Sequence, residues 1–186
     1  MKVTVCAASV FALSLVAAPA LRAQTAADSQ VERGKYLVGI TGCHDCHSPK
    51  IPGGMKPDPD RMLSGRPQTT RVPTAMAGEV HASEDFTAFT GGWGSTVASN
   101  LTPDPATGLG LRYTEAKFVQ TMRSGKKPEG IAMMPPMPVD VYVNMKDEDL
   151  QAIYAYLKTI KPIRNAVRAG LEPPAAPAAP AAPTKK

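Results

Sequence analysis

Five consecutive residues, Cys43-His44-Asp45-Cys46-His47, have the types and the spacing for covalent cofactor chemistry. In a C-x-x-C-H motif the two thiols can add across the two vinyl groups of a haem and form two thioether bonds. The histidine directly after the second cysteine is then held against the iron as its proximal ligand. The motif therefore predicts one haem c, attached through Cys43 and Cys46 and ligated by His47.

Two other kinds of site also use a C-x-x-C pair: a thioredoxin-like redox pair and half of a zinc site. His47 argues against the redox pair, and no βαβ pattern is recognisable around the motif. If Cys6 leaves with an N-terminal leader, the mature chain keeps two thiols, too few for a four-thiolate zinc site. Both alternatives are therefore less favoured than haem attachment.

The composition favours one small domain. The chain has 186 residues, only 5% aromatic residues, 19 prolines and 15 glycines. Such a chain suits long ordered loops wrapped around an apolar group that replaces core side chains. Residues 28–170 hold 17 basic and 15 acidic residues, with no dense basic patch interleaved with aromatics. No nucleic-acid partner is therefore expected.

The two ends differ from the centre. Residues 1–23 have the pattern of a secretory signal peptide, with Lys2, an apolar stretch, Pro19 and then small residues. Cleavage is expected after Ala23 or Ala20, which predicts export to the periplasm. The apolar run is short for a membrane span, so only indirect membrane association is expected. Residues 170–186 are Pro/Ala-rich and predict a disordered tail, which leaves a domain over 28–168.

Capping signals predict where the first helix begins and ends. Ser29 and Glu32 have the spacing of a capping box, so a helix is expected from there to about Ile40. Gly34 in the middle of this helix costs about 1 kcal/mol relative to alanine. Either it is a tolerated exposed glycine, or it permits close contact with another helix, for which the C-terminal helix is the candidate.

Two further helices are expected, and with them an all-α fold. Thr114 caps a helix over 115–124, which Gly125 ends. Asp147 caps the last helix, in which apolar residues follow the spacing i, i+3, i+4, i+7; they are Leu150, Ile153, Tyr154 and Leu157. Residues 48–100, rich in Pro, Gly, Thr and Ser, are expected to cross over the haem as a long excursion, with at most a short helical turn or a hairpin.

The second axial ligand of the iron is expected late in the chain. Met137 is favoured because Pro136 and Pro138 fix the backbone around it and hold its sulfur in place. A thioether ligand raises the potential, as electron-transfer cytochromes require. The alternatives have other interpretations. Met133 and Met134 suit wall residues, and Met145 suits an apolar staple before the last helix. His81 suits a solvated side chain, and the motif geometry directs His44 away from the iron axis.

Several short segments, all in one order, carry a resemblance to a known family. They are Gly34-Lys35-Tyr36-Leu37, the C-x-x-C-H motif, Asn100-Leu101-Thr102-Pro103-Asp104, Thr107-Gly108-Leu109-Gly110, Pro135-Pro136-Met137-Pro138 and the last helix. Together they cover most of 31–165. With them the chain resembles a class I-type cytochrome c, and more narrowly the haem domains in cytochrome subunits of bacterial periplasmic dehydrogenases.

This resemblance implies cytochrome c-like helices around a single haem, with the first and last helices crossing near Gly34 and Tyr154. It aligns Met137 with the axial methionine and implies a bond from Asn100 to a propionate. The spacing departs from compact cytochromes c, since ninety positions separate His47 from Met137 (137 − 47).

The expected function is single-electron transfer without bond chemistry, so the chain is expected to be a carrier and not an enzyme. A periplasmic dehydrogenase is the expected donor, and another cytochrome or a terminal oxidase the expected acceptor. The alternative is a haem enzyme or gas sensor whose distal site is open or labile.

Overall fold

The structure is a computed structural model that describes residues 17–74 and 78–168. Its elements, in chain order, are the helices α1 (Ala17–Ile40) and α2 (Cys43–His47), the 3-10 helix η1 (Pro59–Arg61), the strands β1 (His81–Ala82), β2 (Ala88–Gly91) and β3 (Gly94–Val97), and the helices α3 (Glu115–Ser124), α4 (Val139–Tyr142) and α5 (Asp147–Thr159). The predicted tail and residues 1–16 of the predicted signal peptide lie outside the described residues.

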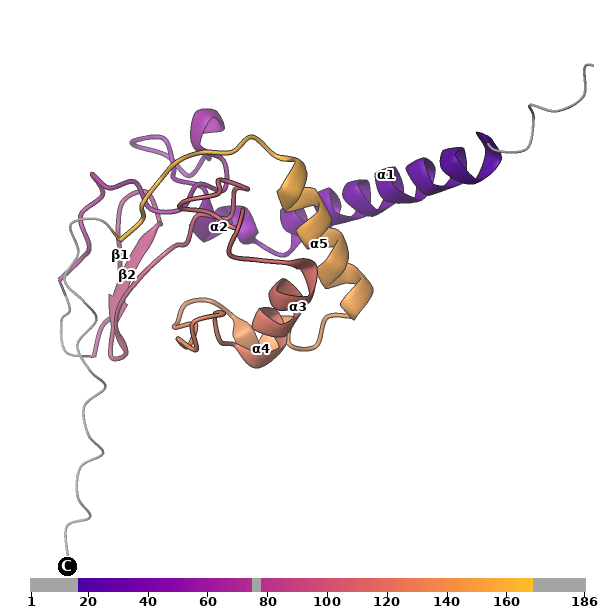
Figure 1. The fold of residues 1–186 in the computed structure, drawn as a ribbon. Coiled ribbons are helices and arrows are strands. Elements are labelled where there is room, and N and C mark those ends of the chain that lie inside the picture. Colours follow the sequence, from indigo (N-terminus) through magenta and orange to yellow (C-terminus); the bar gives the residue numbers. More distant parts are fainter. Residues whose placement is uncertain (1–16, 75–77, 169–186) are drawn as a thin grey trace, which may run out of the picture.

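A small antiparallel sheet stands where the long excursion was expected, so the all-α class is not confirmed. The strands pair in the order β1-β2-β3. Gly91 pairs with Gly94, which makes a tight hairpin between β2 and β3. Trp93 lies in this hairpin, and its indole N–H donates to the Thr96 hydroxyl at 3.1 Å. Figure 1 shows the sheet at the end of the molecule opposite the start of α1.

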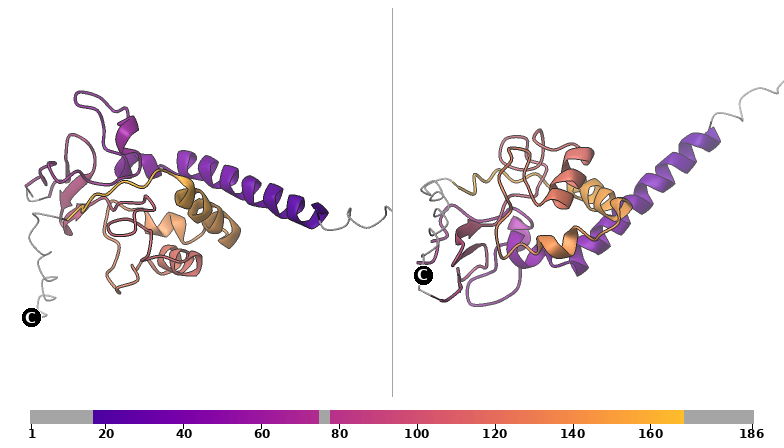
Figure 2. Two further views of the ribbon diagram at one scale, coloured as in Figure 1. Left: turned by 45° about the horizontal axis from the view of Figure 1, so that its top comes forward. Right: turned by 90° about the horizontal axis from the view of Figure 1, so that it is seen from below.

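Helix α1 begins earlier than the capping signals predicted. It starts at Ala17, so residues 17–23 of the predicted signal peptide form its first turns. The hydroxyl of Ser29 donates to the carbonyl of Ala26 at 2.8 Å inside the helix. The capping box at Ser29 is therefore wrong: the backbone preceding it is already helical, and its hydroxyl bonds backward along the helix. The early turns extend beyond the body of the protein in all three views (Figures 1 and 2).

Helices α1 and α5 cross in direct contact at Gly34. A β-carbon on Gly34 would lie 1.9 Å from the carbonyl oxygen of Ala152 and 2.8 Å from the β-carbon of Tyr156. No side chain fits into that space, so Gly34 lets the two backbones approach. Close contact with the C-terminal helix is thereby confirmed. Figures 1 and 2 show α5 lying across the C-terminal half of α1.

Helix α3 has the bounds that its sequence predicts, whereas the start of α5 differs. The Thr114 hydroxyl accepts from the N–H of Lys117 at 3.3 Å, and Gly125 ends α3 with a left-handed φ of 65°. Lys146, not Asp147, is the N-cap of α5, and it makes no side-chain capping bond. The prediction that Asp147 caps this helix was wrong, because its carboxylate accepts hydrogen bonds from Arg123 instead.

The core lies where α1, α3 and α5 meet. Its buried members come from all three helices and from the segments between them: Leu37, Val38, Leu63, Leu109, Phe118, Met122, Tyr142, Leu150, Ala152, Ile153 and Leu157. Cys43, Met133 and Met137 are half-buried and pack against the same cluster. One apolar core therefore supports both the C-x-x-C-H motif and the methionine segment. Among the described helices, none has both the length and the apolar character of a bilayer span.

Candidate haem-binding site

The C-x-x-C-H motif is itself a short helix, α2. The chain enters it through Gly42, whose φ of 75° suits glycine. Helical spacing places Cys43 and Cys46 on one side, with His47 one turn after Cys43. The carbonyl of Thr41, just before the motif, accepts from the Tyr142 hydroxyl at 2.6 Å. The motif is thus fixed to the core at its start.

The two thiols do not have the character of a redox pair. Cys43 and Cys46 are free in the structure, and the pKa of each thiol is raised. Burial is the main cause in both cases. Redox-active C-x-x-C pairs depend on a lowered thiol pKa, because the thiolate is the nucleophile. The surroundings therefore fit thioether attachment better than disulfide exchange.

His47 is oriented for ligation by a backbone carbonyl far along the chain. Its Nδ1 lies 2.7 Å from the carbonyl oxygen of Ser99. A carbonyl only accepts, so Nδ1 carries the proton and Nε2 keeps its lone pair for a metal. Burial, as the largest cause, lowers the pKa of His47 to about 4. The imidazole is therefore neutral near pH 7, which is the form that binds iron.

A cavity of about 430 Å³ opens between the segment that holds His47 and the loop that leads to the methionines. The first segment contributes Val97, Ser99 and Asn100, and the second contributes Lys127, Glu129 and Ile131. The other lining residues are Ala106, Thr107, Arg112, Ala166, Val167 and Arg168. Ser99, whose carbonyl lies 2.7 Å from Nδ1 of His47, is one of the lining residues, so the cavity borders the segment that holds this histidine.

Part of the lining of this cavity suits a haem, although Cys43, Cys46 and His47 are not among the described residues that line it. Its walls are partly apolar, as a porphyrin face requires, and three cations border it: Arg112, Lys127 and Arg168. Burial, followed by the charges of Arg112 and Arg168, lowers the pKa of Lys127, so these cations repel one another. Two haem propionates would supply compensating negative charge beyond that of Glu129, which pairs with Arg112 at 2.7 Å. The sequence interpretation missed all three cations, since they are far apart along the chain.

The methionines differ in burial. Met133 and Met137 are half-buried against the core, whereas the side chain of Met134 is 39% exposed. The Met133 N–H donates to the Gly125 carbonyl at 2.7 Å, and the Met137 N–H donates to the Met134 carbonyl at 3.3 Å. The residues that line the cavity include no methionine in the part of the chain that is described. Met137 as axial ligand stays a prediction.

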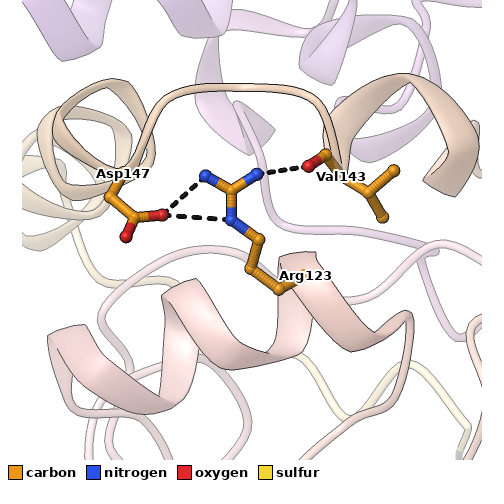
Figure 3. A network of polar contacts seen from close by, with 3 residues as sticks. All are labelled: Arg123, Val143 and Asp147. Carbon is orange, nitrogen blue, oxygen red and sulfur yellow. Dashed lines mark hydrogen bonds and ion pairs between the residues drawn. The ribbon is translucent and has the colours of Figure 1, made fainter.

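Arg123 fixes the chain after the methionine segment. Its guanidinium donates to the carboxylate of Asp147 at 2.6 and 3.0 Å and to the carbonyl of Val143 (Figure 3). Arg123 belongs to α3, Val143 follows α4, and Asp147 begins α5. The ion pair therefore ties the segment that follows Met137 to the helical core.

The remaining candidate residues have partners within the protein. Asn100 donates its amide protons to the Thr107 hydroxyl at 3.2 Å and to the Ile163 carbonyl at 2.7 Å. It lines the cavity, but both donors are in use, so its bond to a propionate stays a prediction. His81 lies in β1 with its Nε2 2.8 Å from Glu79, and His44 shares a hydrogen bond of 2.9 Å with Ser48.

Comparison with known proteins identifies the family. The family model for cytochrome c matches residues 31–161, so the chain belongs to the cytochrome c family. A cytochrome c domain implies a covalently bound haem c. The resemblance that the motifs carry is thereby confirmed.

Several curated relatives are cytochrome subunits of dehydrogenases. The cytochrome c subunit of alcohol dehydrogenase (quinone) from Gluconacetobacter polyoxogenes is 32% identical over 88% of this chain and 28% of its own length. The gluconate 2-dehydrogenase cytochrome c subunit from Pantoea cypripedii is 30% identical over 79% of this chain and 27% of its own length. The fructose dehydrogenase cytochrome subunit from Gluconobacter japonicus is 37% identical over 38% of this chain and 14% of its own length. The chain thus spans 28% or less of the length of these relatives.

Proposed function

We propose that this chain is an exported monohaem cytochrome c that carries single electrons in the periplasm, from a dehydrogenase to a downstream cytochrome or terminal oxidase. The observation that carries the proposal is His47, which follows the second cysteine of α2 and is held by the Ser99 carbonyl with Nε2 unprotonated. A histidine with this orientation, bonded to a segment that lines a cavity bordered by cations, suits haem ligation.

Each part of the site has a task in this proposal. Cys43 and Cys46 hold the haem by thioether bonds, and His47 ligates the iron. Arg112, Lys127 and Arg168, which border the cavity, would compensate the charge of the propionates. The bound haem supplies a one-electron redox centre, and the protein sets its potential through ligation, charge and burial.

The covalent claim is tested on the mature protein from its exporting host. Its mass should exceed that of the polypeptide by one haem, and the haem should stay with the protein through acid–acetone extraction. The same mass spectrum reports whether cleavage occurs after Ala23 or Ala20. Extractable haem, or a mass equal to the polypeptide alone, would contradict the proposal.

We further propose Met137 as the sixth ligand of the iron. It is half-buried against the core that supports Cys43, and the ion pair of Arg123 fixes the chain beyond it. Replacing Met137 with alanine should abolish the near-infrared sulfur-to-iron band and lower the midpoint potential, since thioether ligation favours ferrous haem. Met133→Ala is the matched control, as that side chain is also half-buried against the core. Loss of the band in the control alone would transfer the role to Met133.

A haem enzyme or gas sensor is the second candidate, and one observation favours it: the cavity lining, within the described residues, contains no methionine. Carbon monoxide binding by the native ferrous protein at neutral pH separates the two functions. A six-coordinate electron carrier should not bind carbon monoxide, whereas a haem with an open or labile distal site should bind it.

The dehydrogenase as donor is supported by the relatives, which are named as dehydrogenase subunits. The purified ferric protein should be reduced by an alcohol or gluconate dehydrogenase from the same cell in the presence of that enzyme's substrate. Co-purification with such an enzyme through high salt would indicate a fixed subunit, and reduction without co-purification a free shuttle.

A further inference from the structure

Lys50 lies three residues beyond the C-x-x-C-H motif and is almost fully buried, with 7% of its surface exposed. Its ammonium donates to three backbone carbonyls, those of His44 at 2.8 Å, Asp45 at 2.8 Å and Ser48 at 2.7 Å. Two of these carbonyls belong to α2, and the third belongs to the residue that caps it. The side chain of Lys50 therefore satisfies free carbonyls at the C-terminal end of the motif helix.

The geometry also fixes the charge of this side chain. A neutral amine has two N–H donors, whereas an ammonium has three. Three carbonyl acceptors within 2.8 Å therefore select the charged form. A buried lysine is usually paired with a carboxylate. Within 17–74 and 78–168 no carboxylate oxygen forms an ion pair with Lys50, so its direct partners are uncharged carbonyls. Burial lowers the pKa of Lys50, whereas the charges of Asp45 and Asp85, beyond ion-pair distance, favour its ammonium form.

Hydrogen bonds to the rest of the excursion hold Lys50 in this position. The backbone N–H of Lys50 donates to the Asp85 carbonyl at 3.3 Å, and the Asp58 N–H donates to the Pro49 carbonyl at 2.8 Å. The Ser48 hydroxyl accepts from the N–H of Leu63 at 2.9 Å. Each bond joins the residues just after the motif to a different part of the excursion. The ammonium is thus fixed relative to α2 and cannot swing out to solvent without breaking these contacts.

We propose that Lys50 is a positioning residue that holds the haem-binding helix by the carbonyls of His44, Asp45 and Ser48 and, through its buried charge, raises the reduction potential of the haem. This inference rests on the proposed function. Ferric haem carries one more positive charge than ferrous haem, so a fixed cation nearby disfavours the oxidised state. At an effective dielectric constant of about 20, a unit charge within about 12 Å of the iron would change the reduction equilibrium about tenfold or more.

The test is the midpoint potential of the full holoprotein in which Lys50 is replaced by methionine, a neutral side chain of similar length. We expect the equilibrium constant for reduction to fall about tenfold, equivalent to about 59 mV for one electron. The near-infrared sulfur-to-iron band should stay unchanged, which shows that ligation is intact. Lys50→Arg keeps the charge and should recover most of the wild-type potential.

Lys56→Met is the matched control. Lys56 lies on the same excursion, and its replacement removes the same charge, but its side chain is exposed and solvent screens it. The equilibrium constant for reduction of this variant should therefore stay within about twofold of the wild-type value. A wild-type midpoint potential in Lys50→Met would overturn the inference. An equal fall in midpoint potential in Lys50→Met and Lys56→Met would overturn it as well. If Lys50→Met yields no haem protein, Lys50→Gln replaces it, and a wild-type potential there would likewise overturn the inference.

These outcomes differ from a failure of the proposed function. A wild-type chain without covalent haem would refute the proposed function itself. Wild-type chain with covalent haem and an unchanged potential in the Lys50 variants would refute only the role of Lys50.

Discussion

The helical part of the molecule and the excursion over residues 48–100 are held together by different chemistry. Ten of the eleven fully buried residues in the core cluster belong to α1, α3, α4, α5 or the segments between them, and only Leu63 comes from the excursion. Conversely, eight of the twelve buried polar or charged residues lie within 48–100, among the residues that the structure describes. The helices pack apolar faces, whereas the excursion, which also buries Ala88, Phe89, Val97 and Ala98, holds most of the buried polar groups.

Asp85 shows how the excursion is built. Its carboxylate accepts from the hydroxyls of Thr70, Ser83 and Thr87, and the Ser83 hydroxyl in turn accepts from two backbone N–H groups. Buried polar groups need such partners, since an unpaired one costs about 1–3 kcal/mol. The comparison teaches that a cofactor site can join two regions with different sources of stability, one apolar and one polar. Variants in each region should therefore respond differently.

The largest effect is expected from Gly34→Ala in the helical part. The new β-carbon would meet the Ala152 backbone, so α1 and α5 must separate. We expect a loss of about 3 kcal/mol in the free energy of unfolding, measured by urea denaturation of the holoprotein. A loss below about 1 kcal/mol would show that the helical part does not depend on this close crossing.

A smaller loss is expected from Asn165→Ala, which tests the polar region. Asn165 is 3% exposed, and its amide donates to the carbonyls of Ser64 and Arg66, both at 2.8 Å. Removing it leaves two buried carbonyls without a donor, so we expect a loss of about 2 kcal/mol. Asn144→Ala is the control, because that exposed amide bonds only the Asp140 carbonyl one turn before it. Equal losses in both variants would contradict a special role for buried hydrogen bonds.

The excursion should also be sensitive to acid. Burial favours the protonated form of Asp85, but its hydrogen bonds outweigh that effect and hold its pKa below the ordinary 3.8. The folded state thus binds this proton less readily than the unfolded state, so the stabilisation is complete above pH 3.8 and is lost as pH falls through the folded pKa.

Asp85→Asn should therefore cost about 1–2 kcal/mol at neutral pH and lose less stability than wild type on acidification. Urea titrations of both proteins from neutral pH to below pH 4 check this, with Glu84→Gln on the same loop as the control. Parallel pH curves for wild type and Asp85→Asn would contradict it.

The smallest effect, of opposite sign, is expected from Gly39→Ala. This glycine also lies in α1, but nothing lies within 4 Å of an added β-carbon. Alanine favours helix over glycine, so a gain of about 0.5 kcal/mol is expected. Opposite signs for Gly34→Ala and Gly39→Ala, measured in the same urea assay, would separate packing from helix propensity. Losses of similar size would contradict that separation.

The sequence was a good guide where interactions are local or periodic. Helix α3 has its predicted bounds, and the apolar spacing of α5 identified three fully buried residues, Leu150, Ile153 and Leu157. It was a poor guide where one hydrogen bond decides the structure. Ser29 and Asp147 both have capping residue types, yet each bonds another partner in the fold. A hairpin within 48–100 was allowed for, but the strands were not located, because β1 has two residues and β2 is buried throughout, so neither alternates.

By itself, the sequence determined the attachment chemistry, because C-x-x-C-H is contiguous and its reactive groups are set by covalent spacing. Only the tertiary structure decided how that motif is held. The Ser99 carbonyl reaches His47 across 52 positions, the ammonium of Lys50 closes the end of α2, and three distant cations border the cavity. Long-range hydrogen bonds and charges of this kind leave no periodic pattern, because each depends on where two separate segments meet.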